Sequence, residues 1–80
     1  MALTEAAIQH ILEEHGEMEP HLDGVRRAVE CPTAHRRGWA ANEEWYFLAD
    51  AGPARWLHVV VHFFEEAGSV TTAFGRSQLP

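Results

Sequence analysis

Apolar residues repeat with a helical period near the start of the chain. They are Leu3, Ala7, Ile8, Ile11 and Leu12. This spacing predicts a helix over residues 5–15, with Thr4 as its N-cap. His15 falls near the centre of the apolar face, and His10 falls on its edge, one turn before Glu14. We therefore expect His15, but not His10, to point toward whatever this helix packs against.

A second apolar stripe follows with the same period. Its members are Met18, Leu22, Val25 and Val29. The stripe predicts a helix over residues 19–31, with Pro20 in its first turn and Pro32 ending it. The single cysteine, Cys31, closes the stripe, and we expect it to be a small buried hydrophobic side chain. One cysteine excludes a disulfide within the chain and fits a reducing cytoplasm.

After Pro32 the period changes from that of a helix to that of a strand. Strands are expected over residues 33–37, 44–49, 55–65 and 69–74, with turns or loops at 38–42, 50–53 and 67–69, and a loose tail over 75–80. Two helices followed by a meander predict one α+β domain over residues 1–80. Both helices should cover one face of a three- or four-stranded antiparallel sheet.

The longest expected strand has two unlike faces. Successive side chains of a strand point to opposite faces. One face carries the mostly aliphatic set Leu57, Val59, Val61 and Phe63, and the other carries Trp56, His58, Val60, His62 and Phe64. The aliphatic set should face the helices, which leaves the histidine set on the outer face. His58 and His62 lie about 13 Å apart along a strand, too far to share a metal ion, so no metal is expected. The outer face is a candidate binding surface, and a sheet covered by a second copy is the alternative.

Composition narrows the classes of function. The chain is 46% hydrophobic and 22% charged, as in globular proteins, and no apolar run reaches the ~20 residues that span a membrane. The start MALTEAAIQH lacks the features of a signal peptide, so we expect a cytoplasmic protein without a membrane partner. The net charge is −6, and all six cationic side chains are arginine. This balance counts against indiscriminate nucleic-acid binding but leaves room for one arginine-lined pocket.

Several short motifs, taken in order, resemble a ribonuclease superfamily. They are HILEEHGE (His10–Glu17), ECP (Glu30–Pro32), the pair Arg36-Arg37, an aromatic strand, a valine-rich strand and VTTAF (Val70–Phe74). Their order is similar to that in small prokaryotic and phage proteins of the barnase/EndoU/colicin/RelE-like fold, over Gln9 to Phe74. Gly16 replaces the proline that follows the second histidine in those proteins, and Thr71 stands where an apolar residue is usual.

The resemblance implies an α+β fold and metal-independent cleavage of RNA without a cofactor. It also implies a toxin of a toxin–antitoxin or phage-linked system, with an antitoxin or immunity protein as partner. Carried over residue by residue, the motif histidines are His10 and His15, the basic strand is Arg36-Arg37, and the terminal hydroxyl is Thr72.

Such cleavage needs a base for the 2′-hydroxyl, an acid for the leaving 5′-oxygen and positive charge near the transition state. His15 is the leading candidate because histidine titrates near neutrality and a helix end favours its cation. Arg37 would supply charge, and Thr72 would orient the phosphate. A structural role for His15 and a surface pair of His10 with Glu14 are the alternatives.

Candidate RNA-contacting residues are Arg36, Tyr46, Trp56, His58 and His62. Solvated side chains are the default interpretation for the arginines, and core or cross-strand packing is the preferred one for Tyr46. We expect Val70, Thr72 and Phe74 to share the outer face with His58, whereas His15 starts on the helix side. The two groups can meet only if the sheet is strongly curved or if His15 lies beyond its edge.

A second hypothesis is a non-catalytic interaction domain. In it, Trp56, His58, His62 and Phe64 bind a protein partner or form a homodimer, and the negative net charge favours this interpretation. A histidine-based metal or pH sensor is a third.

Overall fold

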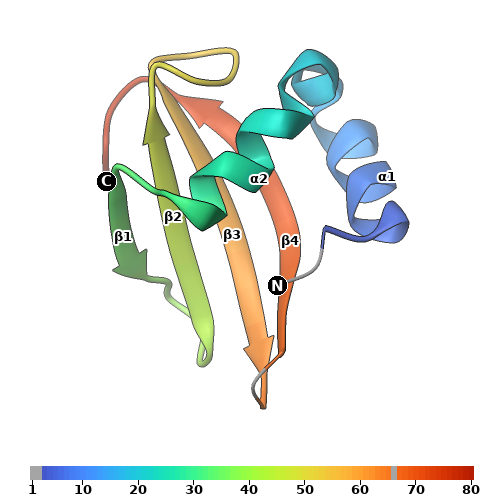
Figure 1. Cartoon of the computed structure of the whole chain (residues 1–80), viewed down its shortest axis with the longest axis vertical. Coiled ribbons are helices and arrows are strands. Elements are labelled where there is room, and N and C mark those ends of the chain that lie inside the picture. The colour runs from blue at the N-terminus through green and yellow to red at the C-terminus, as the bar shows by residue number, and fades with distance from the viewer. Residues whose placement is uncertain (1–2, 66) are drawn as a thin grey trace.

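The chain forms helices first and strands afterwards. The computed structural model describes residues 3–65 and 67–80; Met1, Ala2 and Glu66, which belong to the expected domain 1–80, lie outside the described residues. The elements are α1 (Glu5–Glu14), the 3-10 helix η1 (Gly16–His21), α2 (Leu22–Glu30), β1 (Ala34–Arg37), β2 (Glu43–Ala49), β3 (Trp56–Phe64) and β4 (Ala67–Arg76) (Figure 1). The α+β class predicted from the sequence is confirmed.

The two apolar stripes form helices that differ in regularity: the first is one α-helix, and the second is a 3-10 helix followed by an α-helix. Thr4 caps α1, because its Oγ1 accepts a hydrogen bond of 3.1 Å from the backbone N–H of Ala7. The second helix begins at Leu22, not at residue 19, and residues 16–21 form the tighter η1. Pro20 has no N–H to donate and restricts the residue before it, so the α-helix starts only after it. No helix in the described ranges is long and apolar enough to cross a membrane.

Cys31 is exposed, so the expectation of a buried side chain there was wrong. The helix ends at Glu30, and Cys31 is its C-cap, with a backbone N–H that bonds to the carbonyl of Arg27 at 2.8 Å. A C-cap residue no longer follows the helical period, so its side chain leaves the apolar stripe.

The sheet has the order β1-β2-β3-β4, and all neighbouring strands are antiparallel. The last turn lies earlier than expected, because β4 already begins at Ala67. A bulge sets the register within β4: Val60 pairs with Thr72, but the next residue, Val61, pairs with Val70. The extra residue turns Val70 inward, where it is buried, so its expected place on the outer face beside Thr72 was wrong.

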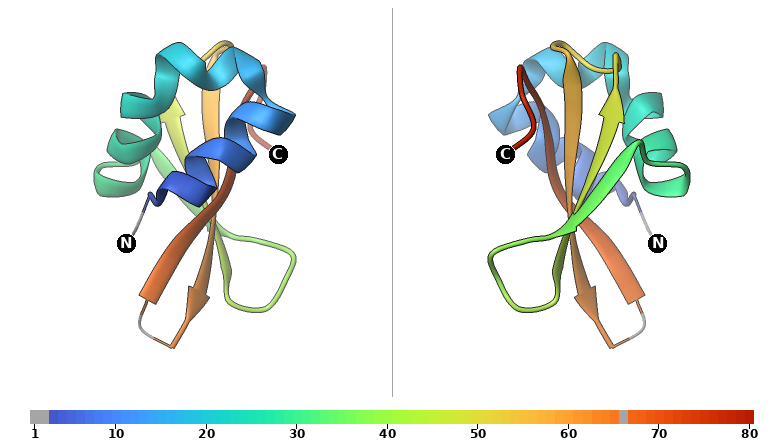
Figure 2. Two further views of the ribbon diagram at one scale, coloured as in Figure 1. Left: turned by 90° about the vertical axis from the view of Figure 1, so that its right-hand side faces the viewer. Right: turned by 90° about the vertical axis from the view of Figure 1, so that its left-hand side faces the viewer.

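The helices cover one face of the sheet, as the alternation in β3 predicts. The buried cluster on that face contains Ala7, Ile11, Met18, Val25, Ala28, Leu57, Val59, Val61, Val70 and Ala73. Figure 2 shows α2 on one side of the sheet, and the β1–β2 loop and the C-terminal end on the other. We call this second side the outer face.

The outer face has a buried centre of its own, although no helix covers it. Phe47 is fully buried, Trp45 is 7% exposed, and His58 is only 1% exposed. The register places Phe47 beside His58, and His58 beside Phe74 on the next strand. His58 therefore faces away from the helices, as expected, but it lies within an aromatic cluster and not in solvent.

Candidate functional site

A row of ring side chains crosses the outer face from the β1–β2 loop to the end of α1. The ring centroids of Trp39 and Trp45 lie 5.2 Å apart, and those of Trp45 and His58 lie 4.8 Å apart. Those of His58 and Phe74 are separated by 4.6 Å, and those of Phe74 and His15 by 5.4 Å. All these distances are typical of favourable ring–ring contacts. We call Trp39, Trp45, His58, Phe74 and His15 the ring row.

His15 reaches the outer face because it lies at the edge of the sheet. It is the C-cap of α1, with φ −138° and ψ 69°, and therefore leaves the helical path. α1 packs along the edge strand β4, and from there the ring of His15 contacts Phe74, an outer-face residue. Its side chain is 31% exposed, and its Nδ1 lies 3.4 Å from a carboxylate oxygen of Glu17. This geometry leaves Nε2 as the ring nitrogen available for other contacts.

His58 is a neutral hydrogen-bond donor at the centre of the row. Its Nδ1 lies 3.4 Å from Nη1 of Arg76, and a guanidinium can only donate, so the ring proton belongs on Nε2. Burial, together with the positive charge of Arg76, lowers the pKa of His58 to about 4, against a smaller opposing effect of Glu43. The buried Nε2 has no hydrogen-bond partner among the described residues. At neutral pH, His58 can donate through Nε2 but does not carry a positive charge.

Thr72 holds a second polar atom without a partner. Its Oγ1 is buried and makes no hydrogen bond within residues 3–65 and 67–80. Thr72 pairs with Val60 and lies two residues from Phe74, so it shares the outer face with His58 on the adjacent strand. Diagonal neighbours of this kind lie about 7–8 Å apart. Buried polar atoms are normally satisfied, so two of them on one face indicate a place where a ligand or water would be bound.

Two arginines of the outer face hold the C-terminal residues. Nη1 of Arg36, in β1, donates to the carbonyl oxygen of Pro80 at 2.6 Å. Nε of Arg76, at the end of β4, donates to the carbonyl oxygen of Gln78 at 2.9 Å. The segment expected to be loose is therefore strand as far as Arg76 and is held by side chains beyond it; Figure 1 shows the C-terminus beside β1.

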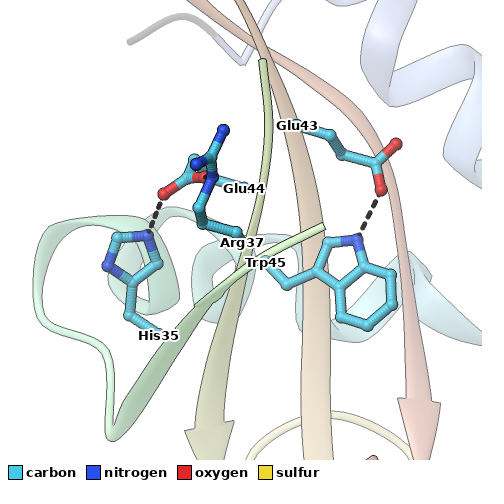
Figure 3. A network of polar contacts seen from close by, with 5 residues as sticks. All are labelled: His35, Arg37, Glu43, Glu44 and Trp45. Atoms are coloured by element: carbon cyan, nitrogen blue, oxygen red, sulfur yellow. Dashed lines mark hydrogen bonds and ion pairs between the residues drawn. The ribbon is translucent and has the colours of Figure 1, made fainter. Parts of the chain in front are cut away.

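Arg37 lies on the opposite face from Thr72. It pairs with Glu44, which in turn pairs with the core residue Val61. The Arg37 side chain is 84% exposed, and its Nε lies 3.9 Å from a carboxylate oxygen of Glu44 (Figure 3). The structure therefore does not bring Arg37 to the hydroxyl of Thr72.

Tyr46 also lies on the helix side of the sheet. Its ring stacks on that of His35 at 4.4 Å with an interplanar angle of 5°. His35 in turn bonds through Nε2 to Glu44 at 2.9 Å (Figure 3). Burial and the charge of Glu44 raise the pKa of Tyr46. This arrangement agrees with the cross-strand packing that was the alternative for Tyr46.

The other candidates lie around the margin of the outer face. Nε2 of His10 lies 3.6 Å from Oε1 of Glu14 on the exposed side of α1. This is the surface pair that was the alternative to a catalytic role for His10. His62 is exposed, and Trp56 is half-buried. Neither makes a ring contact with the ring row.

The sequence analysis missed Trp39 and Arg76. Trp39 is 91% exposed in a segment that the sequence predicts to be a loop, and no periodic pattern there distinguishes it. Arg76 continues the alternation of Thr72 and Phe74, so extending the strand period by two residues would have placed it on the outer face.

A hollow on the helix side contains none of these residues. It has a volume of about 100 Å³ and is lined by Leu3, Val25, Arg26, Val29, Glu30 and Val70. In the part of the chain that the structure describes, no group of three or more His, Cys, Asp or Glu side chains could hold a metal ion.

Comparison with known proteins gives no relative: no protein-family model, curated protein or solved structure matches this chain. The resemblance to the barnase/EndoU/colicin/RelE-like ribonucleases stays a prediction. A functional assignment therefore rests on the ring row and on the polar groups around it.

Proposed function

We propose that the outer face binds a short segment of single-stranded RNA and that His15 promotes its cleavage without a metal ion. The observation that carries the proposal is the ring row. It leads from an exposed tryptophan across the sheet to a histidine at the edge, with two unpartnered polar atoms beside it.

Binding would use stacking and a small number of charges. Unpaired bases stack on aromatic side chains, and each such contact is worth about 1–3 kcal/mol. Trp39 offers an almost fully exposed ring, and Arg36 and Arg76 are the cations on the same face. The net charge of −6 disfavours contact with a long run of phosphates, so a short segment of RNA suits the protein better than a long one.

Cleavage would follow from a transfer of the 2′-hydroxyl proton to Nε2 of His15. The 2′-oxygen then attacks phosphorus, and the bond to the 5′-oxygen breaks. The leaving oxygen takes a proton from water or from the His15 cation, which gives a 2′,3′-cyclic phosphate and a 5′-hydroxyl. Thr72 would orient the phosphate, and Arg76 would take the role first given to Arg37, because it lies on the face of Thr72.

The test is incubation of the protein with RNA in EDTA. We expect cleavage, with a fall of about a hundredfold or more for His15→Ala and a smaller fall for Thr72→Ala, the range typical of a lost proton-transfer group. His21→Gln, on η1 and outside the ring row, is the matched control and should cleave as the wild type does. Intact RNA with the wild type, or unchanged rates in both site variants, would contradict the proposal.

A second function is favoured by a separate observation. Among the described residues, Trp39 and Phe64 are the exposed large hydrophobic residues, at 91% and 74%. Their segments adjoin, because the backbone N–H of Phe63 donates to the carbonyl of Asn42 at 2.8 Å. This end of the molecule would suit an interaction with a protein partner or with a second copy of the chain.

A further inference from the structure

The C-terminal residues 77–80, which we call the tail, cross the outer face from one edge strand to the other. At one end the guanidinium of Arg76 holds the carbonyl of Gln78, and at the other the guanidinium of Arg36 holds the carbonyl of Pro80. β4 and β1 are the opposite edges of the sheet. Leu79, between the two held carbonyls, is half-buried. The tail therefore spans the surface on which the proposed RNA site lies.

The acceptor of Arg76 is the neutral backbone carbonyl of Gln78, and the acceptor of Arg36 is a backbone oxygen of Pro80. An arginine guanidinium binds phosphate or carboxylate oxygens more strongly than it binds a neutral carbonyl. The held carbonyls are two residues apart, so they lie at most about 7 Å from each other. This separation is comparable with that of neighbouring phosphates along an extended single strand, and both contacts are exposed to solvent.

Unpartnered donors lie near one end of the tail. Arg76 contacts Nδ1 of His58, which leaves the Nε2 proton of that buried ring without an acceptor. The hydroxyl of Thr72 is buried and unpartnered on the same face. Carbonyl groups of the tail satisfy the two arginines but neither of these atoms. A phosphate, with several acceptor oxygens, is suited to such a set of donors.

We propose that Arg36 and Arg76 form a two-point site for neighbouring phosphates of single-stranded RNA, and that the tail occupies this site until the RNA displaces it. The inference rests on the proposed RNA binding and adds its phosphate site and its regulation. In the tail-bound state the backbone oxygens of Gln78 and Pro80 take the place of phosphate oxygens. Displacement of the tail frees both guanidinium groups. The apparent affinity for RNA is then reduced by the fraction of molecules in which the tail is bound.

Loosening the tail without removing an arginine tests this site. Leu79→Gly removes the half-buried side chain of the tail and keeps all backbone carbonyls. Gln78→Ala, at an exposed side chain, is the matched control. The probe is a short 2′-O-methyl oligoribonucleotide, which cannot be cleaved, with inorganic pyrophosphate as a second probe. Binding is followed by NMR of the backbone amides and of the arginine Nε–H groups in the full chain.

We expect Leu79→Gly to bind both probes roughly five- to tenfold more tightly than the wild type, and Gln78→Ala to match the wild type. Arg76→Gln, which keeps the fold of β4 in an amide spectrum, should lose pyrophosphate binding. If all variants bind the oligonucleotide equally, the tail and arginine site is overturned while RNA binding stands. If pyrophosphate binds as expected but the oligonucleotide does not, the anion site stands and the RNA assignment fails. If neither probe binds to Leu79→Gly, both the phosphate site and the proposed RNA binding are contradicted.

Discussion

At the scale of single residues, His58 is unusual because it is an ionisable side chain that is almost completely buried. It is 1% exposed and packs against the rings of Trp45, Phe47 and Phe74. Such a position is tolerable only for the neutral ring, because burial penalises the cation and Arg76 repels it. His58 therefore acts as a polar member of an aromatic cluster.

This burial predicts a loss of stability in weak acid. The pKa of His58 is about 4 in the folded protein and near 6.5 when the chain is unfolded, so between these values the unfolded state binds more protons. The free energy of unfolding should be fully retained above pH 6.5 and should fall as the pH drops toward 4. At about 1.4 kcal/mol per pKa unit, the loss is on the order of 3 kcal/mol. Urea denaturation at pH 7, 5.5 and 4.5 measures it.

The control is His58→Leu, which fills the same apolar site without a titrating group. The difference in the free energy of unfolding between wild type and this variant should change with pH over that interval, because the other histidines contribute equally to both proteins. A constant difference from pH 7 to 4.5 would show that His58 is not held neutral.

At the scale of elements, β4 decides where the site residues lie. Its bulge at Thr71 turns Val70 toward the helices and keeps Thr72, Phe74 and Arg76 on the outer face. The period of two residues in the sequence cannot reveal an inserted residue, because a bulge is set by pairing with the neighbouring strand. For this reason Thr72 and Phe74 were placed correctly from the sequence, and Val70 was not.

Gly75 fixes the end of β4 beside Arg76. A Cβ at this position would lie 2.8 Å from Cγ of Pro53 and 3.1 Å from the backbone nitrogen of Ala54. Backbone atoms cannot yield as a flexible side chain can, so Gly75→Ala should lower the free energy of unfolding by about 1–3 kcal/mol. Thermal or urea denaturation measures this loss.

Gly16→Ala is the matched control for Gly75→Ala, because a Cβ on Gly16 meets nothing within 4 Å. It should leave the free energy of unfolding within about 0.5 kcal/mol of the wild type, as surface substitutions usually do. Equal stability of the two variants would mean that the turn before β3 moves freely away from Gly75.

At the scale of the whole molecule, different segments pack on the two faces of the sheet. The helix side is closed by α1 and α2, whereas the outer side is closed in part by the tail and carries exposed Trp39 at its margin. An 80-residue chain has a thin core, and the aromatic cluster of the outer face adds a second one. A ligand or partner that binds this face would therefore also stabilise the fold.

Substitution of the exposed aromatic residues separates the two proposed functions. If the outer face serves self-association, wild type should show a concentration-dependent mass in analytical ultracentrifugation, and Trp39→Ser together with Phe64→Ser should abolish it. If it serves RNA binding, Trp39→Ser should weaken binding of the uncleavable oligonucleotide by about 1–3 kcal/mol at an unchanged monomer mass. Phe64→Ser alone, outside the ring row, should then have little effect on RNA affinity. If these variants change neither the mass nor the affinity for RNA, the result counts against both self-association and RNA binding by the outer face.

By itself, the sequence determined the α+β class, the two helical segments, the approximate bounds of the four strands and the face of β3 that meets the helices. These features follow from local periodicity, which each element carries in its own residues. It also identified His15 and Thr72 as candidate site residues. It did not place Cys31 or Val70 correctly, and it did not identify Trp39 or Arg76.

Only the tertiary structure decided that His15 lies beyond the edge of β4 and contacts Phe74, and that His58 is buried between rings. It also decided that the tail is held by arginines of opposite edge strands. The physical reason is common to all three. Each depends on pairing between distant segments, on a bulge or on a chain end folding back, and none of these leaves a periodic trace in the segment itself.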